Sequence, residues 1–158
     1  YIDGKSFVDY YGNTTPLYDF MKDIIADDKA FEKTITQFDY QGSRYYKGST
    51  ASTNNNQVSK ITVANNFTAL SSFTVDKEYA LVTELYDGEK GNYMYMAMNI
   101  VDPDATGNNN ENMVLTFNNY TNALVFSNGE FSEVALNNHT LTLNNIAPGE
   151  AVFVIPFN

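Results

Sequence analysis

The chain carries the run YALVTELYDGEKGNYMYMAMNIV at residues 79–101. Two apolar segments, residues 79–86 and 92–101, flank a five-residue connection that contains two glycines. Short loops that contain glycine join neighbouring antiparallel strands, because glycine adopts the backbone angles that a tight reversal needs. The run therefore predicts a β-hairpin of two long strands.

Similar but shorter segments fill most of the remaining chain. The sequence predicts further strands at residues 38–46, 59–64, 73–75, 113–117, 123–126, 130–136, 140–143 and 151–155. Asn128-Gly129 suits a two-residue type I′ turn, and Asn137-Asn138 predicts a similar turn one strand later. Pro148-Gly149, between the apolar runs 139–143 and 151–157, predicts a closing hairpin. Short strands at this spacing indicate an all-β fold, an antiparallel β-sandwich.

One segment departs from the strand pattern. Thr15-Pro16 is a typical helix start, with Thr15 as the N-cap residue and Pro16 in the first helical position. Apolar residues then recur at helical spacing, at Leu17, Phe20, Met21, Ile24 and Ile25. This pattern predicts one amphipathic α-helix over about residues 16–33, whose apolar face needs another layer to cover it. We therefore divide the chain into an N-terminal segment with the helix, residues 1–35, and a sandwich domain, residues 36–158.

Composition and charge exclude several classes of partner. The formal net charge is −10, so the chain repels nucleic acid and anionic membrane surfaces. It has no cysteine, which excludes disulfides, thiol catalysis and cysteine-based zinc sites. No apolar run approaches the 18 or so residues that a membrane-spanning helix needs, so we expect no membrane insertion.

The second long strand suggests a binding surface. Its tyrosines at positions 93 and 95 share one face, and the methionines at 94, 96 and 98 share the other, which we expect to be the core face. Tyrosine rings in a row offer a flat platform for a sugar ring, with hydroxyls for hydrogen bonds. The residues that this interpretation assigns to carbohydrate binding are Tyr93, Tyr95, Glu84 and Tyr86. The alternative interpretation is that protein covers the tyrosine face.

The loop after that strand begins like a calcium loop. Asp102 and Asp104 alternate with other residues, and Gly107 takes the sixth position. Met113 then stands where a bidentate glutamate is needed, so a cation would have to find other oxygens. The alternative is a solvated loop without metal, and we expect no other cofactor.

No pattern of residues indicates catalysis. His139, the single histidine, follows the Asn137-Asn138 turn and is expected to be exposed, and no nucleophile elbow is present. Acidic pairs at glycosidase-like spacing, such as Glu84 with Asp87 or Glu130 with Glu133, arise by chance among 19 acidic residues.

Three stretches carry a resemblance to a known family. GNTTPLYDFMK at residues 12–22 resembles the opening of the last helix of the (β/α)8 barrel in bacterial glycoside hydrolases. Residues 141–154, and residues 84–103 with their tyrosine–methionine strand, look like the β-sandwich that follows such barrels. The resemblance implies an amylase C-terminal-like sandwich, although an immunoglobulin-like one also fits the strand pattern. The catalytic carboxylates of that family lie on barrel strands, which this chain does not contain.

These observations predict a non-catalytic C-terminal accessory domain of a glycoside hydrolase. Its partners would be the parent catalytic barrel and, through the tyrosines, polysaccharide. A stand-alone carbohydrate-binding module and a bacterial surface adhesion or assembly module are the alternatives. We expect a location outside a bacterial cell or on its surface.

Overall fold

A computed structural model describes residues 7–51, 66–77, 79–104 and 106–158. The chain divides into two compact units, which we describe separately. The first contains the residues up to Thr36 together with Asn128–Glu130, and the second contains Gln37–Ser127 and Phe131–Asn158.

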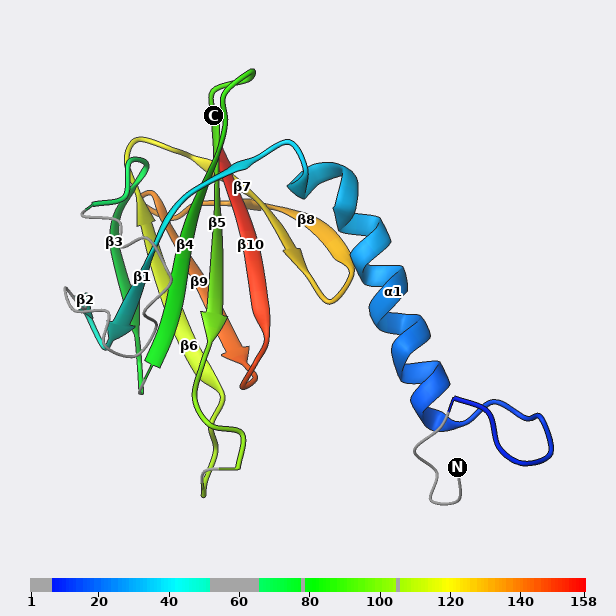
Figure 1. The fold of residues 1–158 in the computed structure, drawn as a ribbon. Helices are drawn as coiled ribbons and strands as arrows, with labels where there is room; N and C mark the ends of the chain where they lie inside the picture. Colours follow the sequence, from blue (N-terminus) through cyan, green and yellow to red (C-terminus); the bar gives the residue numbers. More distant parts are fainter. Residues whose placement is uncertain (1–6, 52–65, 78, 105) are drawn as a thin grey trace. The chain divides into compact units, whose positions relative to one another are not determined.

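In its described residues the first unit contains one helix, α1, which spans Pro16–Ile35 (Figure 1). The prediction of this helix is confirmed, and it ends two residues later than expected. Thr15 stands at the N-cap position with extended backbone angles, and Pro16 opens the helix, but the Thr15 side chain makes no capping hydrogen bond. At the other end the backbone N–H of Thr36 donates to the carbonyl of Glu32, at 3.1 Å.

The second unit is an antiparallel β-sandwich, as the strand pattern predicts. The strands are β1 (Asp39–Lys47), β2 (Thr50–Ala51), β3 (Leu70–Val75), β4 (Tyr79–Asp87), β5 (Asn92–Asn99), β6 (Glu111–Phe117), β7 (Asn122–Ser127), β8 (Glu130–Ala135), β9 (Thr140–Ile146) and β10 (Ala151–Phe157). Seven strands form one sheet in the order β2-β1-β4-β5-β10-β7-β8, and three form the other in the order β3-β6-β9 (Figure 1). The predicted strand at residues 59–64 lies outside the described residues.

The hairpin of β4 and β5 is confirmed. The two strands pair continuously from Ala80 opposite Asn99 to Asp87 opposite Asn92. Asp87 stabilises the connection, because its carboxylate accepts hydrogen bonds from the backbone N–H groups of Glu89 and Lys90, at 2.9 and 3.1 Å. Gly91 takes the positive φ, +74°, that closes the loop.

Of the two turns predicted at asparagines, one lies at the predicted residues and the other is shifted along the chain. Asn128 and Gly129 have φ values of +51° and +77°, as a type I′ turn requires, so this prediction is confirmed. The second turn is centred one residue later than predicted, because the positive φ values fall on Asn138 and His139. There Asn137 and Thr140 exchange both backbone hydrogen bonds.

The predicted closing hairpin is wrong. The turn itself exists, since Gly149 has a φ of +82° and the N–H of Glu150 donates to the carbonyl of Ala147 at 3.0 Å. However, β9 pairs with β6 in the three-stranded sheet, whereas β10 lies between β5 and β7 in the other sheet. The connection crosses from one layer to the other, because a turn signal specifies a chain reversal and not the hydrogen-bond partner of the next strand.

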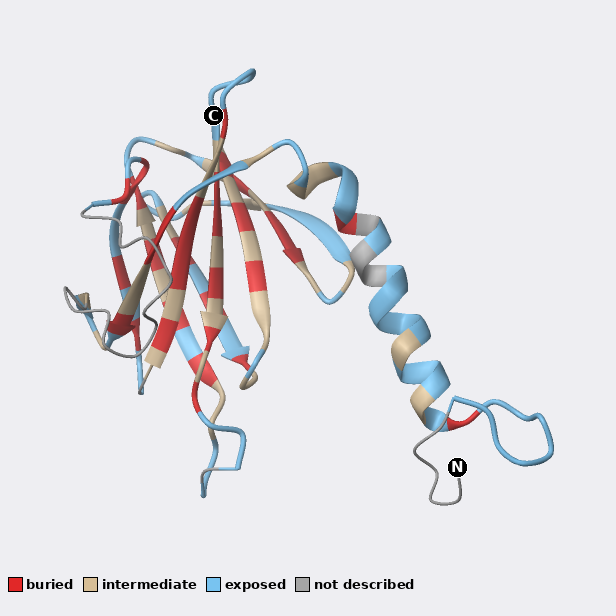
Figure 2. Cartoon of the chain, in the orientation of Figure 1, coloured by how far each residue is buried: buried red, intermediate tan, exposed pale blue. Residues whose placement is uncertain are grey.

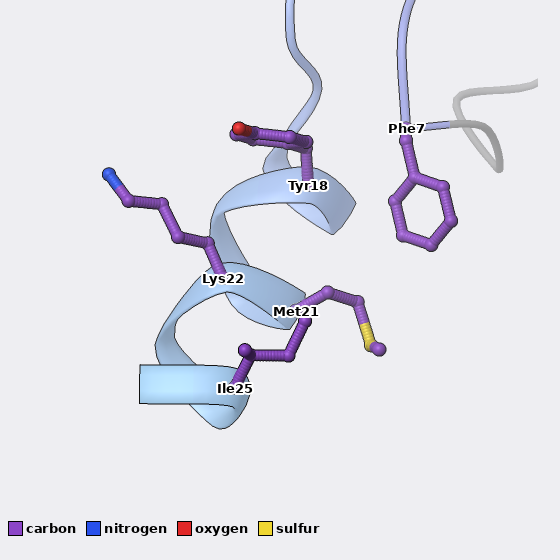
Figure 3. A pocket seen from close by; sticks show the side chains of 5 residues that line it. All are labelled: Phe7, Tyr18, Met21, Lys22 and Ile25. Carbon is purple, nitrogen blue, oxygen red and sulfur yellow. The ribbon is translucent and has the colours of Figure 1, made fainter. Parts of the chain in front are cut away.

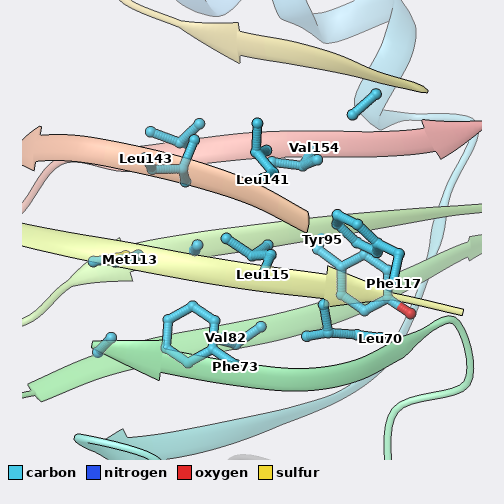
Figure 4. Close-up of a cluster of buried hydrophobic side chains, with 14 of the residues drawn as sticks. Leu70, Phe73, Val82, Tyr95, Met113, Leu115, Phe117, Leu141, Leu143 and Val154 are labelled. Atoms are coloured by element: carbon cyan, nitrogen blue, oxygen red, sulfur yellow. The ribbon is translucent and has the colours of Figure 1, made fainter. Parts of the chain in front are cut away.

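The core lies between the two sheets, and it corrects the prediction for β5. Buried segments recur along the strands of both sheets (Figure 2). Tyr95, which lies in the core cluster (Figure 4), and Ala97 have no exposed surface. The methionines lie on the other face of the strand, where Met94 is fully buried and Met96 and Met98 are partly buried. Alternation separates the two faces of a strand, but when both are apolar it does not tell which one points inward.

Candidate functional site

Most of the exposed large hydrophobic residues that the structure describes lie in the first unit. Ten large hydrophobic residues are exposed among those described, and all except Tyr40 and Phe131 lie between residues 7 and 25. These eight, which we call the exposed apolar segment, are Phe7, Val8, Tyr10, Tyr11, Tyr18, Phe20, Ile24 and Ile25. In a folded domain, other elements normally cover the apolar face of a helix. This segment therefore has the properties of an interface.

A shallow apolar pocket lies within this unit. It has a volume of about 320 Å³. Tyr18, Met21, Lys22 and Ile25 of α1 line it, and Phe7 from the preceding segment closes one side (Figure 3). The lining contains one charge, on Lys22, and otherwise only apolar and aromatic groups.

The loop before α1 is held by one carboxylate. Asp9 Oδ1 accepts hydrogen bonds from the N–H groups of Tyr11 and Asn13, both at 2.8 Å, and its Oδ2 accepts one from the Asn13 amide at 3.0 Å. Hydrogen bonds from the Asn13 side chain and from backbone N–H groups lower the pKa of Asp9. Tyr10 and Tyr11 project from this loop with 94% and 84% of their surface exposed.

The predicted carbohydrate residues do come together, but two of them form a buried network. Tyr95 donates from its hydroxyl to Glu84 Oε2 at 2.5 Å and accepts from the N–H of Ala69 at 2.9 Å. The same Glu84 oxygen accepts from the N–H of Thr68 at 2.6 Å. Burial, and then the neighbouring Glu84 carboxylate, raise the pKa of Tyr95 far above its ordinary value. Because Tyr95 has no exposed surface, it cannot stack on a sugar.

Tyr86 and Tyr93 lie next to this network and are partly buried. Their rings pack on each other with centroids 4.8 Å apart and planes 36° apart. Tyr93 also packs against the core cluster. The predicted row of exposed rings is therefore wrong, since register places this face of the hairpin on the inside of the sandwich.

In the loop that resembles a calcium site, two backbone carbonyls bind the side chain of a lysine from another loop. Asp102 and Asp104 are exposed, and Asp102 Oδ1 accepts from the N–H of Asp104 at 2.9 Å. Further along the loop, the carbonyls of Asn108 and Asn110 both accept from the Lys77 ammonium. No group of three or more acidic or histidine side chains suited to a metal occurs in the described ranges.

A polar cluster at this end of the sandwich was missed by the sequence analysis. The buried Glu111 accepts from the N–H of Lys77 at 2.9 Å, and Asp76 accepts from the backbone and side-chain amides of Asn112, both at 2.7 Å. Burial raises the pKa of Asp76, but the hydrogen bonds from Asn112 and with Glu111 outweigh it and lower that pKa. The hydrogen bonds of this cluster join residues 34 and 36 positions apart, so no local pattern could reveal them.

The acidic pairs and the histidine have structural positions. Glu84 lies in the buried network, and Asp87 caps the β4–β5 loop. Glu130 and Glu133 are both exposed on β8. His139 is exposed, as predicted, and its Nδ1 lies 2.6 Å from the carbonyl oxygen of Tyr120.

The seven-stranded sheet has a second apolar face, turned away from the core, which we call the outer sheet face. Register aligns Thr83, Met96, Phe153 and Phe126 in a row across four strands of this face. The ring of Phe126 lies 4.7 Å from that of Phe131 and 6.4 Å from that of Phe153, measured between centroids. Antiparallel sheets with one wet face usually alternate apolar and polar residues, so this face is typical of a covered sheet.

Comparison with protein-family models, with curated proteins and with solved structures gives no match to this chain. No helix in the described ranges combines the length and the apolar character that crossing a bilayer requires.

Proposed function

We propose that the chain is the C-terminal accessory part of a bacterial glycoside hydrolase. The sandwich braces the catalytic barrel and performs no bond cleavage itself. The exposed apolar segment, apart from Tyr10 and Tyr11 in the loop before α1, packs against the end of that barrel, with α1 as its last helix. The whole protein is expected outside the cell or on its surface.

One observation carries this proposal. Six of the ten exposed large hydrophobic side chains of the described residues lie on α1 or directly before its loop: Phe7, Val8, Tyr18, Phe20, Ile24 and Ile25. Removing apolar surface from water contributes about 25 cal/mol per Å², so such a segment is unfavourable unless protein covers it. The resemblance of residues 12–22 to the last barrel helix supports a catalytic barrel as the covering partner.

The outer sheet face supports the bracing role. Met96 and Phe153 face each other across β5 and β10 on this surface, and both are only partly buried. A sheet that is apolar on both faces is typical of a domain packed on each side. The three-stranded sheet covers one of the two faces.

The test compares the 158-residue chain with the product of the complete reading frame that encodes it. We expect the frame to extend upstream of the Tyr1 codon into a (β/α)8 barrel, and the complete product to hydrolyse aryl glycosides. The isolated chain should give no turnover. A frame without a barrel, or turnover by the isolated chain, contradicts the proposal.

A second measurement tests the bracing contact itself. In the complete product, Phe20→Asp should lower the temperature at which activity is lost, because a carboxylate would enter an apolar contact. Lys29→Gln, at an exposed position of the same helix, makes the same change in charge and should leave that temperature unchanged. Equal effects of the two variants would argue against α1 as a packed barrel helix.

A further inference from the structure

We propose that Tyr10 and Tyr11 form a binding site for a neutral polysaccharide at the tip of the loop before α1. The two rings are the most exposed large hydrophobic side chains of the described residues, at 94% and 84%. This inference rests on the proposed function and assigns the polysaccharide contact to residues different from those that the sequence predicted.

Hydrogen bonds fix the conformation of the loop that carries these rings. Val8 and Thr14 form an isolated β-bridge at its base, and Asp9 and Asn13 are joined by hydrogen bonds of both backbone and side chain. Gly12 has a φ of +87° and turns the chain back toward the helix. A loop fixed in this way loses little conformational entropy when it binds a ligand.

The two rings form an aromatic corner. Their centroids lie 5.4 Å apart and their planes are 87° apart, so one ring stands nearly perpendicular to the other. The exposed fractions show that this contact covers little of either ring. A pyranose can place the C–H groups of its flat face on one ring while its edge meets the second. Within the described residues neither tyrosine hydroxyl has a hydrogen-bond partner, so both can bind sugar hydroxyls.

The negative charge of the chain favours a neutral ligand over an anionic one. The chain carries a net charge of −10, and Asp9 lies directly before the two tyrosines. An acidic polysaccharide, a nucleic acid or an anionic membrane would be repelled. In the proposed arrangement the loop precedes the last helix of a (β/α)8 barrel, and the loops before the helices form the face where such barrels bind substrates.

The experiment is native electrophoresis of the 158-residue chain through gels that contain amylopectin, mixed-linkage β-glucan, xyloglucan or galactomannan. We expect at least one of these polysaccharides to retard the chain. The double variant Tyr10→Ala/Tyr11→Ala should raise the dissociation constant about tenfold or more, as expected when both ring contacts are lost. The double variant to phenylalanine, which keeps the rings, should retain part of the affinity.

Two controls separate ring stacking from general apolar adhesion. Phe20→Ala and Tyr40→Ala remove rings that are 61% and 48% exposed elsewhere, and both variants should be retarded like the unchanged chain. Circular dichroism should show that the double alanine variant keeps its fold, because Asp9 holds the loop without using the two tyrosine side chains.

Two outcomes would overturn the inference: no polysaccharide retards the unchanged chain, or the double alanine variant is retarded as strongly. A protein partner bound by Tyr10 and Tyr11 would give the first of these. Neither outcome affects the proposed bracing role, which is tested by the upstream barrel and by the Phe20→Asp variant and not by polysaccharide.

Discussion

At the residue scale, identical side chains can serve a binding surface or a core, and only their surroundings distinguish the two. The alternation of residues 92–101 correctly placed Tyr93 and Tyr95 on one face. It could not place that face, because the opposite face is also apolar. The hydroxyl of the buried Tyr95 donates to Glu84, which lies directly opposite it across the hairpin. A glutamate and a tyrosine that satisfy each other can enter a core.

Replacing Tyr95 should therefore affect stability. We expect Tyr95→Phe to lower the free energy of unfolding by about 1–3 kcal/mol, because the N–H of Ala69 and the Glu84 carboxylate each lose a partner. Tyr93→Phe, on the same strand but partly exposed, should change it by less than about 0.5 kcal/mol. Urea denaturation at pH 7 measures both. Similar values for the two variants would contradict the buried network.

The raised pKa of Tyr95 also predicts how stability depends on pH. In the unfolded chain this hydroxyl ionises near its ordinary pKa of about 10, whereas in the folded chain it stays protonated to higher pH. The unfolded state therefore loses its proton first, and stability should fall as pH rises above about 10. Urea midpoints between pH 8 and 11 should show this fall, and Tyr95→Phe should weaken it. A Tyr95→Phe profile parallel to that of the unchanged chain would refute the assignment.

From the position of the Lys77 ammonium we predict how the thermal stability of the chain responds to calcium. Because the carbonyls of Asn108 and Asn110 already bind this charge, added calcium or EDTA should leave the thermal midpoint unchanged. Differential scanning calorimetry measures this. A calcium-dependent rise that disappears in Asp102→Asn would instead support the metal site that the sequence suggested.

At the scale of elements, local signals predicted where the chain turns better than which strands pair. The helix start at Thr15-Pro16 and the Asn128-Gly129 turn depend on a few adjacent residues, and both were predictable. The partner of β10 depends on β5 and β7, which lie far away in sequence. Strands that are distant in sequence pair so that their apolar faces are buried together. A local sequence pattern does not show which strands these will be.

The turn between β9 and β10 allows a matched comparison of glycines. A Cβ added at Gly149 would meet no atom within 4 Å, but its φ of +82° disfavours any side chain. We expect Gly149→Ala to destabilise the sandwich by about 1 kcal/mol through the backbone alone. At Gly88 the φ is not positive, and an added Cβ would touch only Tyr86 at 3.9 Å, so Gly88→Ala should be neutral or slightly stabilising. Thermal unfolding ranks the two variants, and the reverse order would contradict this account.

At the scale of the whole molecule, strand spacing and composition were enough to predict an antiparallel sandwich preceded by one helix. The candidate site was less predictable. Sequence patterns pointed to tyrosines that the fold buries fully or in part, whereas Tyr10 and Tyr11 lie outside any regular element, where periodicity carries no information. The exposure of these two rings follows from the conformation of the loop, which the hydrogen bonds of Asp9 hold.

The exposed apolar segment predicts how the isolated chain behaves in solution. Without a covering partner it should self-associate as concentration rises, because apolar patches of this kind seek one another. The double variant Phe20→Glu/Ile24→Glu should remain monomeric, and Tyr40→Glu, on the sandwich, should associate like the unchanged chain. Sedimentation velocity over a range of concentrations distinguishes these states. A monomeric unchanged chain would argue against a missing partner.

The central position of β10 has a consequence during synthesis. This strand is made last of the ten that the structure describes, yet it separates β5 from β7 in the finished sheet. A nascent chain that has not yet released β10 from the ribosome leaves two strand edges open at once, and open edges invite pairing with other chains. Stalled or prematurely terminated translation products should therefore aggregate and depend on chaperones, even though nine of the ten described strands are already present.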